Sequence, residues 1–295
     1  MPDVPHRYVS PEEDSGRWAD FPFRDGDIVI STRSKSGTTW LQMICALLIF
    51  RTPDLPAPLG ELSPWLDHMV TPLEDVIGRL VAQRHRRFIK THTPLDGIPI
   101  DPRATYVVVG RHPLDMAVSL YHQGDNIDRA RLRELTGAPE PTAPPAPRPP
   151  LHDWLVRWIG SHADPRDELD SLPGVMWHLS DAWRRRLQPH VVLVHYADLT
   201  ADLDGTMRRL AEQLGISIDE DHWPDLVRAA TFDAMKGNAG ELVPNRDGVL
   251  ADPVAFFRAG RSGEGRQLLS DAELAAYDAR TAELAPADLL AWLHR

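Results

Sequence analysis

The chain has 295 residues, of which 42% are hydrophobic and 25% are charged, so it can build a sizeable core and is neither disordered nor fibrous. Its 43 acidic and 32 basic side chains give a net charge of -11, which argues against a general nucleic-acid or membrane binder. Cys45 is the one cysteine, which excludes an intrachain disulfide and a cysteine-rich zinc site and suits a reducing compartment. Residues 1–18 lack the apolar core of a signal peptide, and the longest apolar run, 43–50, is too short to span a bilayer. We therefore expect a cytoplasmic protein with no membrane or nucleic-acid partner.

Apolar strands alternate with helical patterns along the chain. Strands are expected at residues 27–32, 87–92, 105–111 and 190–196. Helices are expected at residues 38–50, from Pro113 to about His122, at 175–187 and at 201–214, and a Ser270/Glu273 capping box predicts a last helix from Asp271. This alternation predicts a three-layer α/β fold, with a central parallel β-sheet flanked by helices on both faces.

Residues 136–150 are rich in proline, which supplies no backbone donor and fixes its own φ. A surface loop or mobile insertion is expected there. The half of the chain after Pro150 adds one convincing strand. We therefore expect a single domain over residues 1–295, with a Pro-rich loop insertion at about 136–150, rather than two domains.

The first strand runs into a loop, residues 33–37, that opens a helix. Such a turn aims unpaired backbone N–H groups and the positive helix end at one point, and Gly37 allows close approach while Lys35 adds charge. These features predict a phosphate cradle, although an ordinary strand-to-helix loop with a solvated lysine would have the same composition. The loop is not a Walker A motif, because Lys35 precedes the glycine instead of following it.

A second anion site is predicted at the end of the third strand. Arg111 at the strand end and Ser119, about two turns into the next helix, can reach one phosphate. A pair between Arg111 and Asp115 is the alternative. If the strands are parallel, Lys35, His92 and Arg111 converge beyond their carboxyl ends, where open α/β sheets bind ligands.

Three motifs in order along the chain resemble those of the cytosolic-type sulfotransferases, which use 3′-phosphoadenosine 5′-phosphosulfate (PAPS). The loop at residues 35–40, the strand end at 90–94 and the segment at 109–119 match the family's 5′-phosphosulfate, catalytic and 3′-phosphate segments. The resemblance covers residues 27 to about 267. It implies a P-loop nucleotide-hydrolase-like fold and a sulfotransferase domain.

The resemblance assigns roles to particular residues. His92 is implied as general base, Lys35 as the contact to the 5′-phosphate and the leaving oxygen, and Lys90 as a sulfonate contact. From spacing alone, His92 is as easily a packed side chain and Lys90 a solvated one. The remaining implied PAPS-binding residues are Ser36, Gly37, Thr38, Thr39, Trp40, Arg111, Ser119, Tyr196, Thr231, Phe232, Arg258, Ala259 and Gly260.

Trp40 and Phe232 are implied to stack the adenine, and Tyr196 and Thr231 to hydrogen-bond it. The apolar stripe of the helix alone favours a core role for Trp40. The sequence departs from the family at Ala259, where a lysine is usual, which removes one charge near the 3′-phosphate. Arg261 and Arg266 are candidates to compensate.

We therefore expect an enzyme of bacterial type that transfers the sulfuryl group from PAPS to a hydroxyl of a small, hydrophobic acceptor such as a phenol, alcohol, sterol or secondary metabolite, with 3′,5′-ADP (PAP) as product and no metal. The alternatives are a non-catalytic PAP- or PAPS-binding regulator and an ATP-dependent small-molecule kinase. The candidates for the acceptor pocket are Phe21, Phe23, Trp65, Leu66, Tyr121, His122, Trp154 and Trp158. A homo-oligomer is allowed, but the dimerisation motif of some relatives is not recognisable in residues 267–295.

Overall fold

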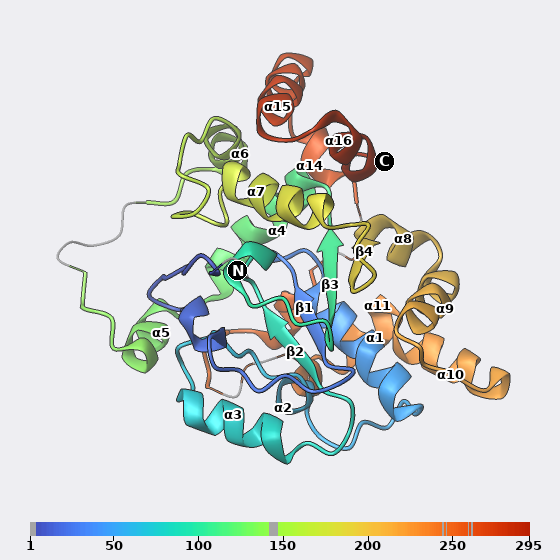
Figure 1. Ribbon diagram of the computed structural model, residues 1–295. Coiled ribbons are helices and arrows are strands. Elements are labelled where there is room, and N and C mark those ends of the chain that lie inside the picture. The colour runs from blue at the N-terminus through green and yellow to red at the C-terminus, as the bar shows by residue number, and fades with distance from the viewer. Residues whose placement is uncertain (1–3, 142–146, 244, 246, 259, 261) are drawn as a thin grey trace.

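A four-stranded parallel sheet forms the centre of the computed structural model, which describes residues 4–141, 147–243, 245, 247–258, 260 and 262–295 (Figure 1). The strands are β1 (Ile28–Ser31), β2 (Phe88–Thr91), β3 (Thr105–Gly110) and β4 (Val191–His195). Their order is β2-β1-β3-β4, and each neighbouring pair is parallel. The expected α/β fold is confirmed, and the carboxyl ends of β1, β2 and β3 lie side by side.

Each strand is buried on both faces, because alternate residues enter two different hydrophobic clusters. Ile28 and Ile30 of β1 pack into one cluster, and Val29 packs into the other. Val107 and Val108 of β3 divide in the same way. This explains why β1, β3 and β4 carry consecutive apolar residues rather than alternating apolar and polar ones.

Helices cover both faces of the sheet (Figure 1). The first face carries residues from α1 (Thr38–Phe50), α9 (Leu203–Gln213), α10 (Trp223–Ala229) and α11 (Phe232–Gly237). The other face carries residues from α3 (Leu73–Ala82), α4 (Pro113–Asn126), α6 (Leu151–Ile159), α7 (Leu172–Arg184), α15 (Asp271–Leu284) and α16 (Ala287–Leu293). The shorter helices are α2 (Leu59–Leu62), α5 (Arg129–Thr136), α8 (Tyr196–Ala201), α12 (Ala239–Leu242), α13 (Pro253–Phe256) and α14 (Glu264–Gln267). Three 3₁₀ turns lie at Ser15–Trp18, Leu95–Gly97 and Glu220–His222.

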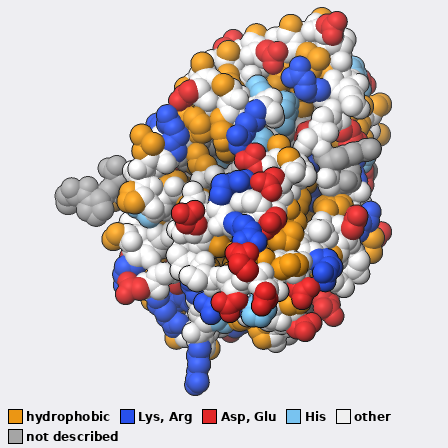
Figure 2. Space-filling view, turned by 90° about the vertical axis from the view of Figure 1, so that its right-hand side faces the viewer, with side chains coloured by type: hydrophobic (Ala, Val, Ile, Leu, Met, Phe, Trp, Pro, Cys, Tyr) orange, Lys and Arg blue, Asp and Glu red, His pale blue; other side chains and the backbone are white. Residues whose placement is uncertain are grey.

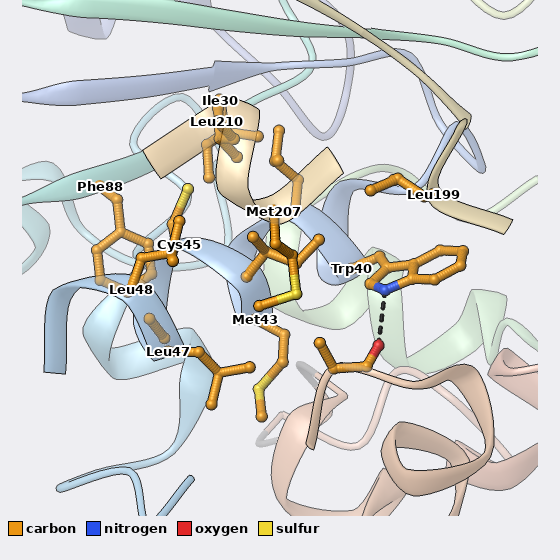
Figure 3. Packing of buried hydrophobic residues seen from close by; sticks show 14 of the residues in the cluster. Ile30, Trp40, Met43, Cys45, Leu47, Leu48, Phe88, Leu199, Met207 and Leu210 are labelled. Atoms are coloured by element: carbon orange, nitrogen blue, oxygen red, sulfur yellow. Dashed lines mark hydrogen bonds between the residues drawn. The ribbon is translucent and has the colours of Figure 1, made fainter. Parts of the chain in front are cut away.

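The α1 helix is buried along most of its length, so it lies inside the first cluster and not on the surface. Figure 3 shows Met43, Cys45, Leu47 and Leu48 of α1 within this cluster, with Trp40 at its edge. Because α1 is fixed by packing on several sides, the loop that precedes it is held in place at its helical end.

Several expected boundaries were wrong. The helix expected at 175–187 is α7, which starts earlier because the Ser171 side chain accepts a hydrogen bond from Gly174 N and Pro173 lies in the first turn. Tyr196 opens α8 instead of ending β4. The helix from Asp271 has the predicted capping box but is not the last helix, since α16 follows. Helices α3, α5 and α6 were not predicted. Residues 142–146 of the Pro-rich stretch lie outside the described residues.

A buried ion pair ties the start of β1 to the start of β2. Arg87 donates to both carboxylate oxygens of Asp27, with Nε 2.8 Å from Oδ1, and the two side chains are 1% and 2% exposed. Asp27 also accepts from Arg24 N at 2.8 Å and so closes the turn before β1. The pair joins β1 to β2 at their amino ends, opposite the carboxyl ends that border a cleft.

We expect Asp27→Ala to lower the free energy of unfolding by about 3–5 kcal/mol, because it leaves the Arg87 charge buried without its partner. Urea unfolding followed by circular dichroism measures this. Asp204→Ala, which breaks an exposed ion pair with Arg208, is the matched control and should leave the stability nearly unchanged. The double variant Asp27→Ala/Arg87→Met should recover part of the loss. Equal stabilities for wild type and Asp27→Ala would contradict the assignment.

Candidate functional site

A cleft of about 1450 Å³ lies beyond the carboxyl ends of β1, β2 and β3. Most of the residues predicted for the site line it, namely Lys35, Gly37, Thr38, Thr39, Trp40, Lys90, His92, Arg111, Ser119, Tyr196, Phe232, Arg258 and Gly260. They reach the cleft from segments far apart in sequence, because parallel strands bring their carboxyl ends to one edge of the sheet.

The loop between β1 and α1 has the conformation of an anion cradle. Lys35 and Gly37 both adopt left-handed backbone conformations, with φ of 61° and 103°. A Cβ at Gly37 would lie 3.0 Å from the Tyr196 ring, so no side chain fits there. Gly37 is the N-cap of α1 and no side chain caps that end. The first N–H groups of α1 are therefore left to bind an anion.

Lys35 is held over the cleft by polar and aromatic groups. Its Nζ donates to Gln123 Oε1 at 3.2 Å and to the Phe256 carbonyl at 3.4 Å, and it lies 3.9 Å from the centre of the Phe256 ring. Burial, and then the nearby charges of Arg111, Lys90 and Arg258, lower the pKa of Lys35 to about 7. A bound anion would reverse this effect and favour the charged form.

Lys90 is the second buried cation. It lies near the carboxyl end of β2 and lines the cleft. Its side chain is 8% exposed and places Nζ 3.7 Å from the centre of the Trp65 ring. Burial lowers the pKa of Lys90 to about 8, although Glu13 and Asp67 act in the opposite direction. No hydrogen bond or ion pair of its ammonium is found among the described residues, so its donors are available to a ligand.

His92 immediately follows β2 and is oriented by the residue that follows β1. Its Nδ1 is hydrogen-bonded to the Thr32 carbonyl. Because a carbonyl only accepts, Nδ1 carries the proton and Nε2 carries the lone pair. Burial, followed by the charges of Lys90 and Arg33, lowers the pKa of His92 well below its usual value, so the ring is neutral. A neutral imidazole with a free Nε2 is the form that a general base requires.

Arg111 lies at the end of β3 and is turned toward the phosphate loop. Its Nη1 donates to the Lys35 carbonyl at 2.7 Å, and its guanidinium lies 4.4 Å from the centre of the Tyr196 ring. Its Nε is buried and has no hydrogen-bond partner within the described part of the chain. Asp115 instead accepts from the N–H groups of Gly263 and Gly265, so the alternative pair with Arg111 does not form.

Aromatic rings line the far end of the same cleft. Trp40 donates from Nε1 to the Ala230 carbonyl at 2.8 Å, the dashed bond in Figure 3. It meets Phe232 at a ring separation of 6.4 Å and an angle of 64°, so the two rings are tilted rather than parallel. A Cβ at Gly260 would lie 2.5 Å from the Phe232 ring, which fixes glycine there. Trp40 is therefore both a core residue and a wall of the cleft.

Some predicted residues have other partners. Ser36 and Thr231 do not line the cleft, and the Thr231 hydroxyl caps α11 and donates to the Arg228 carbonyl at 2.8 Å. Arg258 lines the cleft, but both of its terminal nitrogens donate to the Glu264 carboxylate, at 2.9 and 2.6 Å. Ala259 and Arg261 lie outside the described residues. Arg266 is exposed and is not part of the cleft wall.

Most of the acceptor-side candidates do not line the cleft, and several have the ordinary core role that their apolar character equally allowed. Trp65 and Trp154 line the cleft. Phe21, Phe23, Leu66 and Trp158 are core residues in the second cluster, because a buried aromatic pattern does not distinguish core from cavity. Tyr121 and His122 are half-buried away from the cleft wall.

Charged residues that the sequence motifs did not indicate complete the wall near His92. Glu12 and Glu13 come from the N-terminal segment, Asp170 precedes α7, and Arg129 opens α5. Arg33 joins Asp170 to the site, since its Nη2 lies 2.6 Å from Asp170 and its Nη1 donates to the His92 carbonyl. Arg33 could have been found from sequence, because it belongs to the phosphate loop at residues 33–37. The acidic residues and Arg129 come from segments that carry no motif.

Lys35, Lys90 and Arg111 line the cleft, whose wall also carries acidic side chains such as Glu13 and Asp170. On the face in Figure 2, Lys and Arg side chains are interspersed with Asp and Glu.

Within the described residues, no helix is long and apolar enough to cross a bilayer, and no group of three or more His, Cys, Asp or Glu side chains could hold a metal ion.

Comparisons with known proteins identify the family of the chain. Residues 25–286 match the family model of the sulfotransferase domain. The chain is 44% identical over 308 residues to a glycolipid sulfotransferase of Mycobacterium bovis, covering 97% of this chain and 93% of that protein. It is 27% identical to human sulfotransferase 2B1, covering 86% of this chain and 65% of the relative.

Solved structures share the fold. Retinol dehydratase in complex with androsterone and the inactive cofactor PAP superposes with a TM-score of 0.68 at 20% identity, over 95% of this chain and 89% of that one. A mouse sulfotransferase complexed with PAP also gives 0.68, at 19% identity over 95% and 92%. The family model and the mycobacterial relative each span most of the chain, and so the protein belongs to the sulfotransferase family.

Proposed function

We propose that this sulfotransferase moves the sulfuryl group of PAPS to a hydroxyl of an amphiphilic acceptor, with His92 as general base. The observation that carries the proposal is the pairing of a neutral imidazole with buried cations in one cleft. His92 offers the Nε2 lone pair, and Lys35 and Lys90 lie around the same space. These are the groups that transfer of an anionic group to an alcohol needs.

The nucleotide fits the part of the cleft between the phosphate loop and the aromatic residues. The N–H groups at the start of α1, with Lys35, Thr38 and Thr39, would hold the 5′-phosphosulfate. Arg111, Ser119 and Arg258 would hold the 3′-phosphate, and the unpartnered Arg111 Nε supports this assignment. Trp40 and Phe232 would contact the adenine, with Tyr196 beside it, whereas Thr231 caps α11 outside the cleft. Structural relatives were crystallised with PAP, which is consistent with this nucleotide.

The reaction follows from the positions of the side chains. The acceptor oxygen attacks sulfur while His92 Nε2 takes the hydroxyl proton, and the bond between sulfur and the 5′-phosphate oxygen breaks. Lys35 stabilises the charge on the departing oxygen, and Lys90 stabilises the equatorial oxygens of the sulfuryl group. The Arg33 contact to the His92 carbonyl holds the base in place during this exchange.

The acceptor half of the cleft suits a molecule with both apolar and hydroxyl-rich parts. Trp65, Trp154 and Leu132 offer apolar contact, whereas Glu12, Glu13 and Asp170 offer hydrogen-bond acceptors. A wholly apolar acceptor would strip water from these carboxylates without replacing it, which is costly. The name of the 44% identical relative, glycolipid sulfotransferase, points to the same class. We therefore propose a glycolipid-like acceptor in place of a purely hydrophobic one.

We expect His92→Ala to lower kcat by about 10²–10⁴-fold while PAP binding is kept. Transfer from PAPS is measured with octyl glucoside, cholesterol and 4-nitrophenol as acceptors, and PAP binding by calorimetry. His152→Ala, at an exposed position outside the cleft, is the control. Octyl glucoside should be the best acceptor of the three. Wild-type protein that binds PAP but sulfates none of them, or that uses ATP instead, would contradict the proposed function.

We expect Ser119→Ala and Arg111→Ala to weaken binding of PAP by about tenfold or more, because each loses a hydrogen bond to a charged phosphate. Binding of adenosine 5′-monophosphate, which has no 3′-phosphate, should change much less. Calorimetric titration of both nucleotides gives the comparison. Parallel losses for the two nucleotides would place these side chains elsewhere on the ligand.

PAP binding at pH 8 should take up about one proton from the buffer, because the phosphates raise the lowered pKa values of Lys35 and Lys90. At pH 6 both lysines are already charged in the empty cleft, so their contribution should vanish. Titrations in two buffers of different ionisation enthalpy measure the uptake. A binding heat at pH 8 that does not depend on the buffer would be inconsistent with neutral lysines.

A further inference from the structure

We propose that Asp67 is a positioning residue of the transfer reaction, which holds the backbone on both sides of His92 and keeps negative charge behind Lys90. This inference rests on the proposed function. Asp67 belongs to none of the motifs, is completely buried, and lies outside the cleft wall.

The contacts of Asp67 converge on one oxygen. Oδ2 accepts hydrogen bonds from the hydroxyl of Thr91, from the hydroxyl of Thr93 at 2.6 Å and from Trp18 Nε1 at 3.2 Å. Thr91 and Thr93 are the neighbours of His92 in the chain. Asp67 therefore holds the chain immediately before and after the imidazole.

The two threonines connect this anchor to the sheet. Thr93 N donates to the Thr91 hydroxyl at 2.9 Å, and Ser31 at the end of β1 donates to the Thr93 carbonyl at 2.7 Å. The His92 ring is hydrogen-bonded to the Thr32 carbonyl. The direction of His92 Nε2 thus depends on a turn that Asp67 closes.

The segment that carries Asp67 also contacts Lys90. Lys90 N donates to the Pro64 carbonyl at 3.0 Å, and the Trp65 ring lies under the Lys90 ammonium at 3.7 Å. Asp14 N donates to the Asp67 carbonyl at 2.9 Å, which joins the N-terminal segment to the same place. A shift of residues 64–67 would therefore move the base and the sulfuryl-binding lysine together.

Asp67 Oδ2 accepts three hydrogen bonds, an arrangement that stabilises the ionised form of a carboxylate. Oδ1 has no hydrogen-bond partner among the described residues, and burial raises the pKa of Asp67. A neutral amide could accept the same donors, so hydrogen bonding alone does not require a charge here. The charge has an effect on Lys90, because the Asp67 carboxylate opposes the loss of the lysine proton.

Other charged and titratable groups act on the same lysine and must be considered with it. They are Glu13 from the N-terminal segment, His68 next to Asp67, Lys35 from the phosphate loop, and His92. Arg33 acts in turn on Glu13 and His92. Of these, Glu13 is the other carboxylate, and burial raises its pKa to about 8. Asp67 has three donors to stabilise its anion, so we assign the charge to Asp67 at neutral pH.

The test compares Asp67→Asn with wild type in the transfer assay, using the best of octyl glucoside, cholesterol and 4-nitrophenol. We expect kcat to fall about 10- to 100-fold, with PAP affinity unchanged at pH 6, where Lys90 is already charged. Without the carboxylate, Lys90 loses its proton at lower pH, so the alkaline limb of kcat should move to lower pH. Asp96→Asn is the matched control: its half-buried carboxylate accepts from Tyr8 at 2.8 Å, away from the cleft, and it should behave as wild type.

A second variant separates the two roles. Thr93→Val removes one hydrogen bond to Asp67 but keeps the charge, so kcat should fall without a shift of the alkaline limb. Nuclear magnetic resonance of labelled histidine and lysine side chains follows the His92 tautomer and the Lys90 titration without any acceptor. Asp67→Asn should disturb the first and move the second to lower pH.

An unchanged rate and pH profile in Asp67→Asn would overturn the inference. So would a lower rate with the alkaline limb and both resonance signals unchanged, because that pattern marks a merely structural role. A wild-type protein inactive with all three acceptors would count against the proposed function alone. The resonance titrations would then still decide the part played by Asp67.

Discussion

The site depends on positive charge that is buried without carboxylate partners. Lys35, Lys90 and Arg111 enter one cleft, and within the described residues none of the three forms an ion pair with an acidic side chain. Burial lowers the pKa of each group, so the empty cleft is held in an electrostatically unfavourable state. A polyanionic ligand relieves that cost. This explains how a chain with a net charge of -11 can carry a strong anion site, since the relevant charge is local and is enclosed by low-dielectric walls.

Much of the anion-binding half of the site, around Lys35, Lys90 and Arg111, could be predicted from sequence. Consecutive apolar residues in β1, β3 and β4 made the strands and their parallel arrangement predictable, and parallel strands must bring residues 33–37, Lys90 and Arg111 to one edge. The chemistry of phosphate binding also requires a glycine and a free helix end, which leave a recognisable pattern at residues 35–40. The orientation of His92 was not predictable, because the Thr32 carbonyl that selects its tautomer comes from the loop after β1 and carries no sequence signal of its own.

The acceptor half was predicted poorly, for a physical reason. Phe21 and Trp158 have the same apolar character as Trp65 and Trp154, and only the packing of the finished fold decides which ring faces a cavity. Glu13 and Asp170 come from segments without regular structure, where no hydrophobic periodicity indicates direction. Helix α7 shows the same limit on a smaller scale: the cap at Ser171 decides where it starts, and the apolar pattern alone placed the start at Val175.

The proposed nucleotide and acceptor halves of the cleft are connected within the protein itself, through hydrogen bonds to backbone carbonyls near His92. Arg33 donates to the His92 carbonyl and pairs with Asp170 of the acceptor wall, so an acceptor that displaces Asp170 also acts on the group that holds the base. On the other side of the imidazole, Thr91 and Thr93 tie His92 to the buried Asp67. His92 is thus held on one side by Arg33, which pairs with Asp170 of the cleft wall. On the other side it is held through the buried Asp67, which does not line the cleft. In the proposed reaction, these two contacts would let the imidazole respond to the acceptor on one side while Asp67 keeps its direction from the other.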